Sequence, residues 1–188
     1  VVAVPTDPLY GLAASALDEP AVRRVFQLKG RPEGGAMPIL LDDLDRVAMC
    51  AHEIPDVAWE LMDRFWPGAL TLVLRRSPQI PSTVSGGKNT VALRVPDHRV
   101  PRDIVVQLDA PITGTSANRS GEQGLTNAEA VRKEFGAELD LVIDGLAVAG
   151  LPSTVLDLTE ERPSVLREGA VATSKIVEVL GTALASDD

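Results

Sequence analysis

The sequence is poor in several residue types that particular protein classes need. Only 3% of its 188 residues are aromatic, so a surface that stacks nucleic-acid bases on Phe, Tyr and Trp is not expected. Positive charge is in deficit, with 18 Lys and Arg against 27 Asp and Glu, whereas non-specific nucleic-acid binders carry the opposite balance. The single cysteine, Cys50, cannot form an internal disulfide, which fits a reducing compartment, and we therefore expect a cytoplasmic protein.

No stretch of the sequence is long and uncharged enough to predict a membrane span. The longest run without Asp, Glu, Lys or Arg covers residues 145–156 and is rich in Gly, Ser and Pro. The chain begins with Val and shows no signal peptide, and we expect its N-terminus to be trimmed. Because no repeat or linker divides the sequence, residues 1–182 are predicted to form one domain and residues 183–188 a frayed tail.

Short apolar runs alternate with amphipathic segments, which indicates an α/β domain. We predict strands at residues 1–4, 38–41, 69–74, 90–95, 111–114, 139–143, 153–158 and 164–167. Helices are predicted from Asp18 to Gly30, over residues 56–65 and 100–108, from Thr126 or Asn127 to Gly136, and from Thr173 or Ser174 onward. Because the last strands follow one another closely, like hairpins, we expect one mixed sheet with parallel and antiparallel pairs.

Motifs of several common catalytic classes fail at one position. Residues 85–90 resemble a phosphate-binding loop, but Asn89 stands where a magnesium-binding hydroxyl belongs. Residues 114–118 miss a serine-nucleophile turn because Asn118 replaces the second Gly. The two histidines are His52, in a segment predicted to be helical, and His98, in a strand-to-helix turn, and with one cysteine they cannot build a metal site.

Cations at two places point to an anionic ligand. Lys29 and Arg31 flank Gly30 at a helix end, where Lys and Arg also serve as ordinary caps. Arg94 lies in an otherwise apolar strand, and a buried Arg must be paired with an anion. From the residues alone, an internal ion pair and the binding of a ligand explain Arg94 equally well.

Small polar residues adjoin several predicted strands. Thr115, Ser116 and Asn118 follow the strand at residues 111–114, and open α/β sheets bind ligands at the C-terminal ends of their strands. Ser153 enters a later strand in the same way. Each such segment alone is typical of a plain polar turn, so only their combination is informative.

Seven segments in a fixed order carry a resemblance to a known family. They are residues 5–13, 29–32, 65–71, 93–96, 115–121, 152–155 and 166–169. In these segments the chain closely resembles the YrdC family of threonylcarbamoyl-AMP synthases, in which a Lys and Arg pair, here Lys29 and Arg31, accompanies a Ser and Asn pair, here Ser116 and Asn118. The resemblance implies the YrdC-like fold, a twisted mixed parallel and antiparallel sheet with flanking helices and a central positive cavity.

The activity that the resemblance implies is a nucleotidyltransfer. L-threonine, bicarbonate and ATP would form threonylcarbamoyl-AMP and pyrophosphate, with Mg²⁺ carried in on ATP. A separate complex would then transfer the threonylcarbamoyl group to tRNA, which gives threonylcarbamoyladenosine. Positioning and charge stabilisation suffice for such chemistry, so neither a protein nucleophile nor a protein-bound metal is expected.

The resemblance also implies roles for individual residues. Lys29 and Arg31 are implied to be catalytic and to contact the ATP phosphates. The residues implied to complete the nucleotide site are Thr90, Ser116, Asn118, Thr126 and Arg167. Those implied to hold L-threonine are Tyr10, Arg94, Ser116 and Ser153.

Pro8 departs from the family pattern, which has a threonine there that contacts the amino acid, because proline supplies neither a hydroxyl nor an N–H. Two alternatives stay open. One is a YrdC-like enzyme that forms a carbamoyl-adenylate from carbamoyl phosphate. The other is a non-enzymatic translation factor that binds tRNA or double-stranded RNA through a basic strip, composed of Arg23, Arg24, Lys29 and Arg31.

Overall fold

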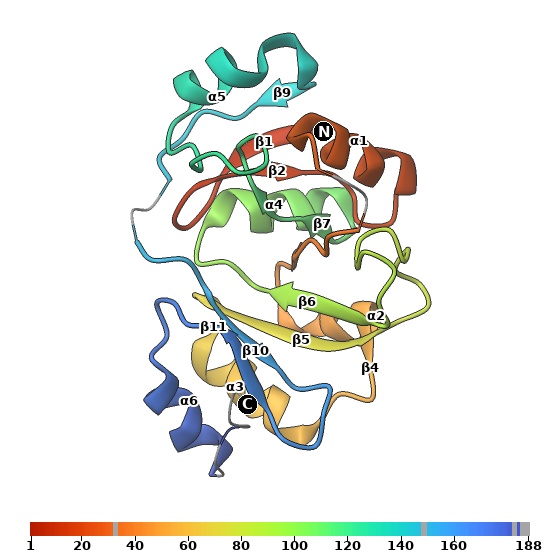
Figure 1. Cartoon of the computed structure of the whole chain (residues 1–188), viewed down its shortest axis with the longest axis vertical. Coiled ribbons are helices and arrows are strands. Elements are labelled where there is room, and N and C mark those ends of the chain that lie inside the picture. The colour runs from red at the N-terminus through yellow and green to blue at the C-terminus, as the bar shows by residue number, and fades with distance from the viewer. Residues whose placement is uncertain (32–33, 148–149, 182–183, 185–188) are drawn as a thin grey trace.

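The computed structural model describes residues 1–31, 34–147, 150–181 and 184. The predicted domain end at residue 182 and the predicted tail, apart from residue 184, lie outside these ranges. In the described part of the chain the strands form two sheets, which are stacked along the long axis of the molecule (Figure 1). Since both sheets contain strands from both halves of the sequence, distant segments meet where the two layers face each other.

The upper layer is a four-stranded sheet in the order β8-β2-β1-β9. β1 (Val2–Pro5) pairs antiparallel with β2 (Tyr10–Ala13), and β2 pairs antiparallel with β8 (Thr115–Ser116). β9 (Leu141–Val142) lies parallel to β1 on the other side. Because β8 lies beside β2, it comes close to the loop between β1 and β2.

The lower layer is a seven-stranded sheet in the order β11-β10-β5-β6-β3-β7, with β4 paired to β5 off this path. Its strands are β3 (Ile39–Leu40), β4 (Ala51–His52), β5 (Leu70–Arg76), β6 (Thr90–Arg94), β7 (Ile112–Thr113), β10 (Thr154–Asp157) and β11 (Ser164–Arg167). The pairs β3 with β6 and β5 with β10 are parallel, and the others are antiparallel. The predicted mixture of pairings is therefore confirmed.

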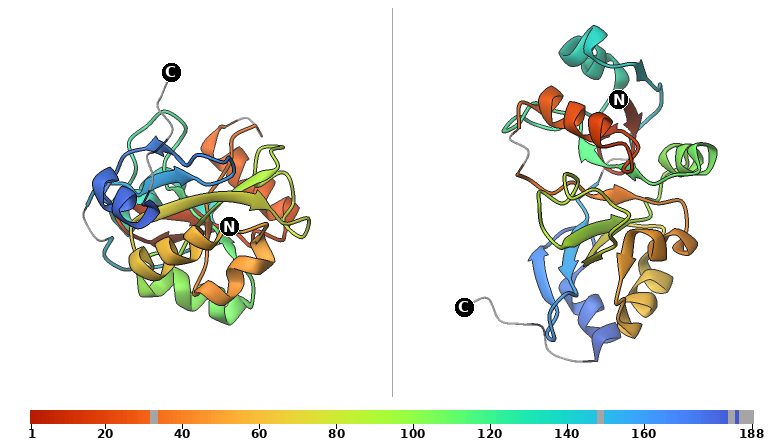
Figure 2. Two further views of the ribbon diagram at one scale, coloured as in Figure 1. Left: turned by 90° about the horizontal axis from the view of Figure 1, so that it is seen from below. Right: turned by 90° about the vertical axis from the view of Figure 1, so that its right-hand side faces the viewer.

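Helices cover both layers. The α-helices in the described ranges are α1 (Glu19–Lys29), α2 (Val47–Cys50), α3 (Asp56–Phe65), α4 (Arg99–Leu108), α5 (Ala128–Phe135) and α6 (Thr173–Leu180). Helices α3 and α6 pack on each other at the lower sheet, whereas α1 and α4 lie on opposite sides of the upper sheet (Figure 2). The upper sheet is thus covered on both faces.

The alternation of apolar side chains in β1 accounts for this double covering. Val4 belongs to a small buried cluster with Val105 of α4, whereas Ala3 belongs to the larger core that contains Phe26 of α1. Successive side chains of a strand point to opposite faces, so a four-residue strand reaches both helices.

Most of the predicted elements are confirmed. α3 has the predicted bounds. α1 begins after Asp18, whose side chain accepts a hydrogen bond from the Ala21 N–H, and it ends at Gly30, which has a left-handed φ of 61°. Pairing of β10 with β11 confirms the hairpin expected near the end of the chain.

Several details of the prediction are wrong. The strands form two sheets rather than one, because β2, which was not predicted, pairs with β1 and separates this layer from the others. The segment around His52 is extended as β4, since it pairs with β5. Neither Thr173 nor Ser174 caps α6, because Ala172 occupies the N-cap position.

Candidate active site

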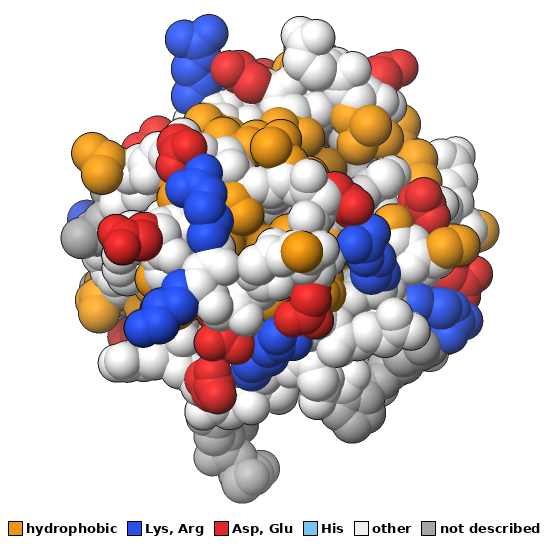
Figure 3. All heavy atoms as spheres, turned by 90° about the horizontal axis from the view of Figure 1, so that it is seen from above, with side chains coloured by type: hydrophobic (Ala, Val, Ile, Leu, Met, Phe, Trp, Pro, Cys, Tyr) orange, Lys and Arg blue, Asp and Glu red, His pale blue; other side chains and the backbone are white. Residues whose placement is uncertain are grey.

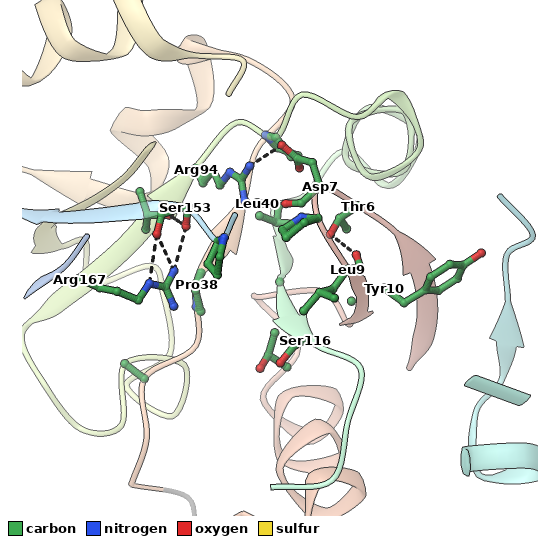
Figure 4. Close-up of a pocket in the computed structure, with 18 of the residues that line it drawn as sticks. Thr6, Asp7, Leu9, Tyr10, Pro38, Leu40, Arg94, Ser116, Ser153 and Arg167 are labelled. Carbon is green, nitrogen blue, oxygen red and sulfur yellow. Dashed lines mark hydrogen bonds and ion pairs between the residues drawn. The ribbon is translucent and has the colours of Figure 1, made fainter. Parts of the chain in front are cut away.

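A cavity of about 510 Å³ lies where the two layers meet, a size typical of small-molecule sites. The upper layer contributes β8 and the loop between β1 and β2, and the lower layer contributes β3, β5, β6 and the segment that enters β10. Figure 4 shows Arg94 and Arg167 on one side of this cavity and Leu9 on the other. Among the described residues, the charged ones that line it are Arg31, Arg94, Arg167 and Asp7. The cavity is therefore mainly positive, although the chain carries a net charge of −9.

The guanidinium of Arg94, at the end of β6, donates three hydrogen bonds to other residues of the protein. Its Nη2 donates to the Asp7 carboxylate, its Nη1 to the Asp7 main-chain oxygen at 3.1 Å, and its Nε to Gly68 O at 2.7 Å. The side chains of Arg94 and Asp7 are 10% and 14% exposed. The ion pair expected as one explanation of Arg94 is thus present, yet Arg94 also lines the cavity. Contacts with described residues use three of the five N–H donors of the guanidinium, which leaves two for a ligand.

Asp7 is a site residue that was not predicted. Its Oδ1 is buried without a hydrogen-bond partner among the residues that the structure describes. Burial raises the pKa of Asp7, an effect that the attraction of Arg94 opposes, and burial also lowers the pKa of Arg94. The pair therefore sits where charges are poorly solvated, a setting in which electrostatic contacts with a ligand are strong. Two features of the sequence could have indicated Asp7. A buried Arg needs an anion, and Asp7 lies in one of the segments that carry the family resemblance.

Ser153 is fixed by residues of two strands. Its Oγ lies 2.9 Å from Thr71 Oγ1, and Arg167 Nη2 donates to Ser153 Oγ at 3.1 Å and to Ser153 O at 2.8 Å. Because Gly169 has no side chain, the segment that contains Arg167 can lie this close to the segment that contains Ser153. A Cβ on Gly169 would lie 2.2 Å from Pro152 O. The structure thus brings the predicted residues Ser153 and Arg167 together and adds Thr71, which was not predicted.

Arg31 lines the same cavity and differs from Arg94 in its partners. None of its guanidinium donors makes a hydrogen bond to a residue in the described ranges. A planar guanidinium binds phosphate or carboxylate through two parallel hydrogen bonds. Arg31 is therefore the best-placed group for an anion that enters the cavity.

Gly35 is expected to be required for the position of Arg31. A Cβ on Gly35 would lie 1.9 Å from Arg31 Nη2 and 2.2 Å from Arg31 Cζ, so the arginine would have to move. We expect Gly35→Ala to weaken the binding of a phosphate anion, with inorganic pyrophosphate as the probe, about tenfold or more, measured by calorimetry. Gly34→Ala is the matched control, because a Cβ there meets nothing within 4 Å. Equal affinities of the two variants would contradict this role of Gly35.

Lys29 is placed differently from Arg31. Its side chain is buried and is not among those that line the described cavity. Its Nζ instead donates to the main-chain oxygens of Ser116 and Asn118 and to Asn118 Oδ1. Of the four residues that carry the family resemblance most specifically, Arg31 and Ser116 therefore line the cavity, while Lys29 and Asn118 lie behind its wall.

The titration of Lys29 is expected to affect stability at alkaline pH. Burial, with a smaller contribution from Arg31, lowers the pKa of Lys29 to about 8, whereas a lysine in an unfolded chain titrates near pH 10.4. Between these values the unfolded chain binds a proton that the folded chain has lost, so this group makes folding more favourable as the pH rises. The free energy of unfolding of wild type, relative to Lys29→Met, should therefore increase from pH 8 to pH 10 in urea titrations. A constant or falling difference would contradict the shift.

Three other predicted residues lie at the edge of the site or outside it. Tyr10 is among the lining residues, but its ring points away (Figure 4), and its hydroxyl contacts Ile143 O at 3.0 Å and Gly145 O at 2.9 Å. Thr90 begins β6 on the same strand face as Arg94, and Thr126 is exposed just before the N-cap of α5. Within the described ranges, neither threonine lines the cavity.

Other chemistries find little support in the described residues. Burial raises the pKa of Cys50 to about 12, which makes it a poor nucleophile. No group of three or more His, Cys, Asp and Glu that could hold a metal occurs among the residues with a described position. Among the same residues, no helix has both the length and the apolar character needed to cross a membrane.

The basic strip considered for RNA binding is not a single exposed patch. Arg23 pairs with Glu19, Arg24 pairs with Asp140, and Lys29 is buried. On the face shown in Figure 3, Lys and Arg side chains are interspersed with Asp and Glu. This face therefore lacks the continuous positive surface that binding to a nucleic-acid backbone favours.

Comparisons with known proteins show similarity over most of the chain. The family model for Sua5, YciO and YrdC, described as "Telomere recombination", matches residues 1–169. The threonylcarbamoyl-AMP synthase of Pyrococcus abyssi is 42% identical over 96% of this chain and 54% of its own length, and that of Bacillus subtilis is 37% identical over 96% and 53%. A crystal structure of P. abyssi Sua5 complexed with L-threonine has a TM-score of 0.92 and 42% identity, covering 96% of this chain and 53% of the other.

This chain thus spans about half the length of these two curated relatives. The family model nevertheless matches most of the present chain. The matched residues include the β1–β2 loop, Arg31, Arg94 and Ser116, which line the cavity. The structural match extends over both layers, since it covers 96% of the chain. The chain belongs to the Sua5/YciO/YrdC family.

Proposed function

We propose that this chain catalyses the formation of threonylcarbamoyl-AMP and pyrophosphate from L-threonine, bicarbonate and MgATP. The observation that carries the proposal is the arginine-lined cavity between the two sheets, because it offers separate cationic groups to a carboxylate and to phosphates. The similarity to two threonylcarbamoyl-AMP synthases over 96% of the chain supports the choice of reaction. So does the fold shared with a Sua5 structure that contains L-threonine.

In this proposal the amino acid binds beside the Arg94–Asp7 pair. The two remaining donors of Arg94 would hold the threonine carboxylate, and the hydroxyls of Ser153 and Ser116 would complete the pocket. Tyr10 would line the pocket without donating a free polar group, because its hydroxyl, its main-chain N–H and its main-chain O already have hydrogen-bond partners. Pro8 lines the same space, so the threonine side chain would meet an apolar wall there.

The nucleotide would lie toward Arg31 and Arg167. All guanidinium donors of Arg31 lack partners among the described residues and would serve the phosphates, and Arg167 is exposed at the edge of the same cavity. Thr90 and Thr126 would contact ATP only at its periphery, given their places outside the lining. Mg²⁺ would enter as part of MgATP, since among the described residues the carboxylate that lines the cavity is that of Asp7, which is paired with Arg94.

The chemistry needs positioning more than a protein nucleophile. The threonine amine and bicarbonate form a carbamate with loss of water. A carbamate oxygen then attacks the α-phosphorus of ATP, the new P–O bond forms, and the bond to pyrophosphate breaks. Cations around the phosphates stabilise the charge that develops on the leaving group, which is what an arginine-lined cavity supplies.

The proposal places the chain in tRNA modification. The adenylate is a reactive mixed anhydride, so a separate transfer complex would have to consume it on tRNA, in the cytoplasm. Direct RNA binding by this chain is not required, since the product rather than the enzyme must reach the acceptor.

Pyrophosphate release from MgATP tests the proposed activity. Release should require both L-threonine and bicarbonate, and omission of either should reduce it to background. Carbamoyl phosphate is supplied in a parallel reaction as the alternative donor. Release with carbamoyl phosphate alone would assign the chain to the alternative carbamoyl-adenylate chemistry, and no release with RNA bound in a steeply salt-dependent way would favour the translation factor.

A further inference from the structure

Lys29 has no N–H donor left for a phosphate. The residue is 4% exposed, and Nζ donates to Ser116 O at 2.6 Å, Asn118 O at 3.1 Å and Asn118 Oδ1 at 3.0 Å. An ammonium group has three N–H donors and no acceptor, so these three contacts use all of them. A phosphate could bind Lys29 only if it displaced part of this buried network.

Asn118 is the centre of that network. Its Oδ1 accepts from Lys29 and also from Ser116 Oγ at 2.6 Å. Its Nδ2 donates to Arg119 O at 2.7 Å and to Glu122 O at 2.9 Å. Each polar atom of the amide is therefore used, and its orientation is fixed because the oxygen must face the two donors.

The segment at residues 116–122 also caps the end of α1. Ser120 N donates to Lys29 O at 2.7 Å, and Arg119 Nη1 donates to Leu28 O at 2.6 Å. The last carbonyls of a helix have no partner within the helix, so these bonds satisfy groups that would otherwise be orphaned. The side chain of Lys29 in turn donates its hydrogen bonds to this segment. Hydrogen bonds in both directions therefore join the end of α1 to the segment.

We propose that Lys29 is a positioning residue, which fixes the segment at residues 116–122 to the end of α1 so that the Ser116 hydroxyl faces the cavity beside Arg31. Arg31, two positions further along the chain, lines the cavity and is the cation that contacts the phosphate. In this arrangement Lys29 acts through Ser116 and Asn118 and does not touch the nucleotide. The phosphate part of this inference rests on the proposed function, whereas the fixing of the segment does not.

Hydrogen exchange of the ligand-free protein tests the fixing directly. Lys29→Met removes the charge and the donors but keeps a long side chain, and it should accelerate exchange of the Ser120 and Glu122 amides about tenfold or more. Arg31→Met is the matched control and should leave exchange of these amides at the wild-type rate. Unchanged exchange in Lys29→Met would overturn the proposal. Since no substrate is present, this result is independent of whether the protein releases pyrophosphate.

The variant Lys29→Arg distinguishes a direct phosphate contact of Lys29 from its positioning of the 116–122 segment. It is also the test variant if Lys29→Met does not fold. Arginine is at least as good a phosphate ligand as lysine, so a direct contact predicts that ATP affinity is kept. A planar guanidinium cannot reproduce the three converging contacts of Nζ. The proposal therefore predicts faster exchange of the Ser120 amide and weaker ATP binding, by about tenfold. Wild-type exchange with wild-type ATP affinity would overturn it.

Discussion

Replacing Arg94 with alanine is expected to weaken L-threonine binding by about 10- to 100-fold and to leave ATP binding close to wild type. The reason is that Arg94 lines the cavity and that contacts with described residues use only three of its five guanidinium donors. Hydrogen bonds between charged groups are the strongest polar contacts that a small amino acid can make there. Calorimetric titration with each ligand separately measures both effects.

The same variant should lose stability, and a second substitution separates this loss from the loss of binding. Removing Arg94 leaves the Asp7 carboxylate without its partner at a buried position, a type of change that costs ~3–5 kcal/mol. The double variant Arg94→Ala with Asp7→Asn should recover part of the stability but none of the threonine affinity. Arg99→Ala is the surface control, since the Arg99 side chain is 88% exposed. Equal losses for threonine and ATP in Arg94→Ala would contradict the assignment.

Replacing Arg31 with methionine is expected to have the opposite selectivity. ATP binding should weaken by about 10- to 100-fold, while L-threonine binding changes little. The guanidinium of Arg31 lines the cavity without a hydrogen bond to any described residue, so a phosphate is the partner that its donors lack. Titration calorimetry with ATP and with L-threonine gives the two affinities.

Thermal unfolding distinguishes the two arginine variants. Arg31→Met leaves no described polar group without its partner, so its melting temperature should stay near that of wild type, whereas Arg94→Ala should melt at a lower temperature. A large fall in the melting temperature of Arg31→Met would show that Arg31 supports the fold, and its effect on ATP would then need another explanation.

The fold was predictable wherever short-range patterns decide the structure. Helix α3 has the predicted bounds because an apolar stripe precedes the stop at Pro67 and Gly68, and α1 has its predicted caps at Asp18 and Gly30. The two-residue strands are too short to show a period of two. Their pairing is decided by long-range contacts, so the separation into two layers could not be read from the sequence.

The sequence predicted which residues belong to the candidate site better than it predicted how their side chains are oriented. Arg94, Ser116, Ser153, Arg31 and Arg167 do meet in one cavity. The direction of a side chain depends on partners from distant segments, however. Tyr10 turns its hydroxyl away because the main chain of the 143–145 segment accepts its hydrogen bonds.

Two further residues show why pairing was the harder part of the prediction. The sequence required an anion for a buried Arg94, but which of many acidic residues supplies it depends on how the β1–β2 loop meets β6, and that residue is Asp7. The contact of Lys29 with the ATP phosphates stays a prediction. The sequence did not indicate that the 116–122 segment covers the Lys29 side chain, because that contact joins residues far apart in the sequence.

The most direct test of the proposed activity is the identity of the product. The protein is incubated with L-threonine, MgATP and bicarbonate labelled with carbon-13, and the adenylate fraction is analysed by mass spectrometry. The proposal predicts an AMP adduct that contains threonine and one labelled carbon and is absent without threonine. An adduct that forms only with carbamoyl phosphate, or the release of unmodified AMP without any adduct, would contradict it.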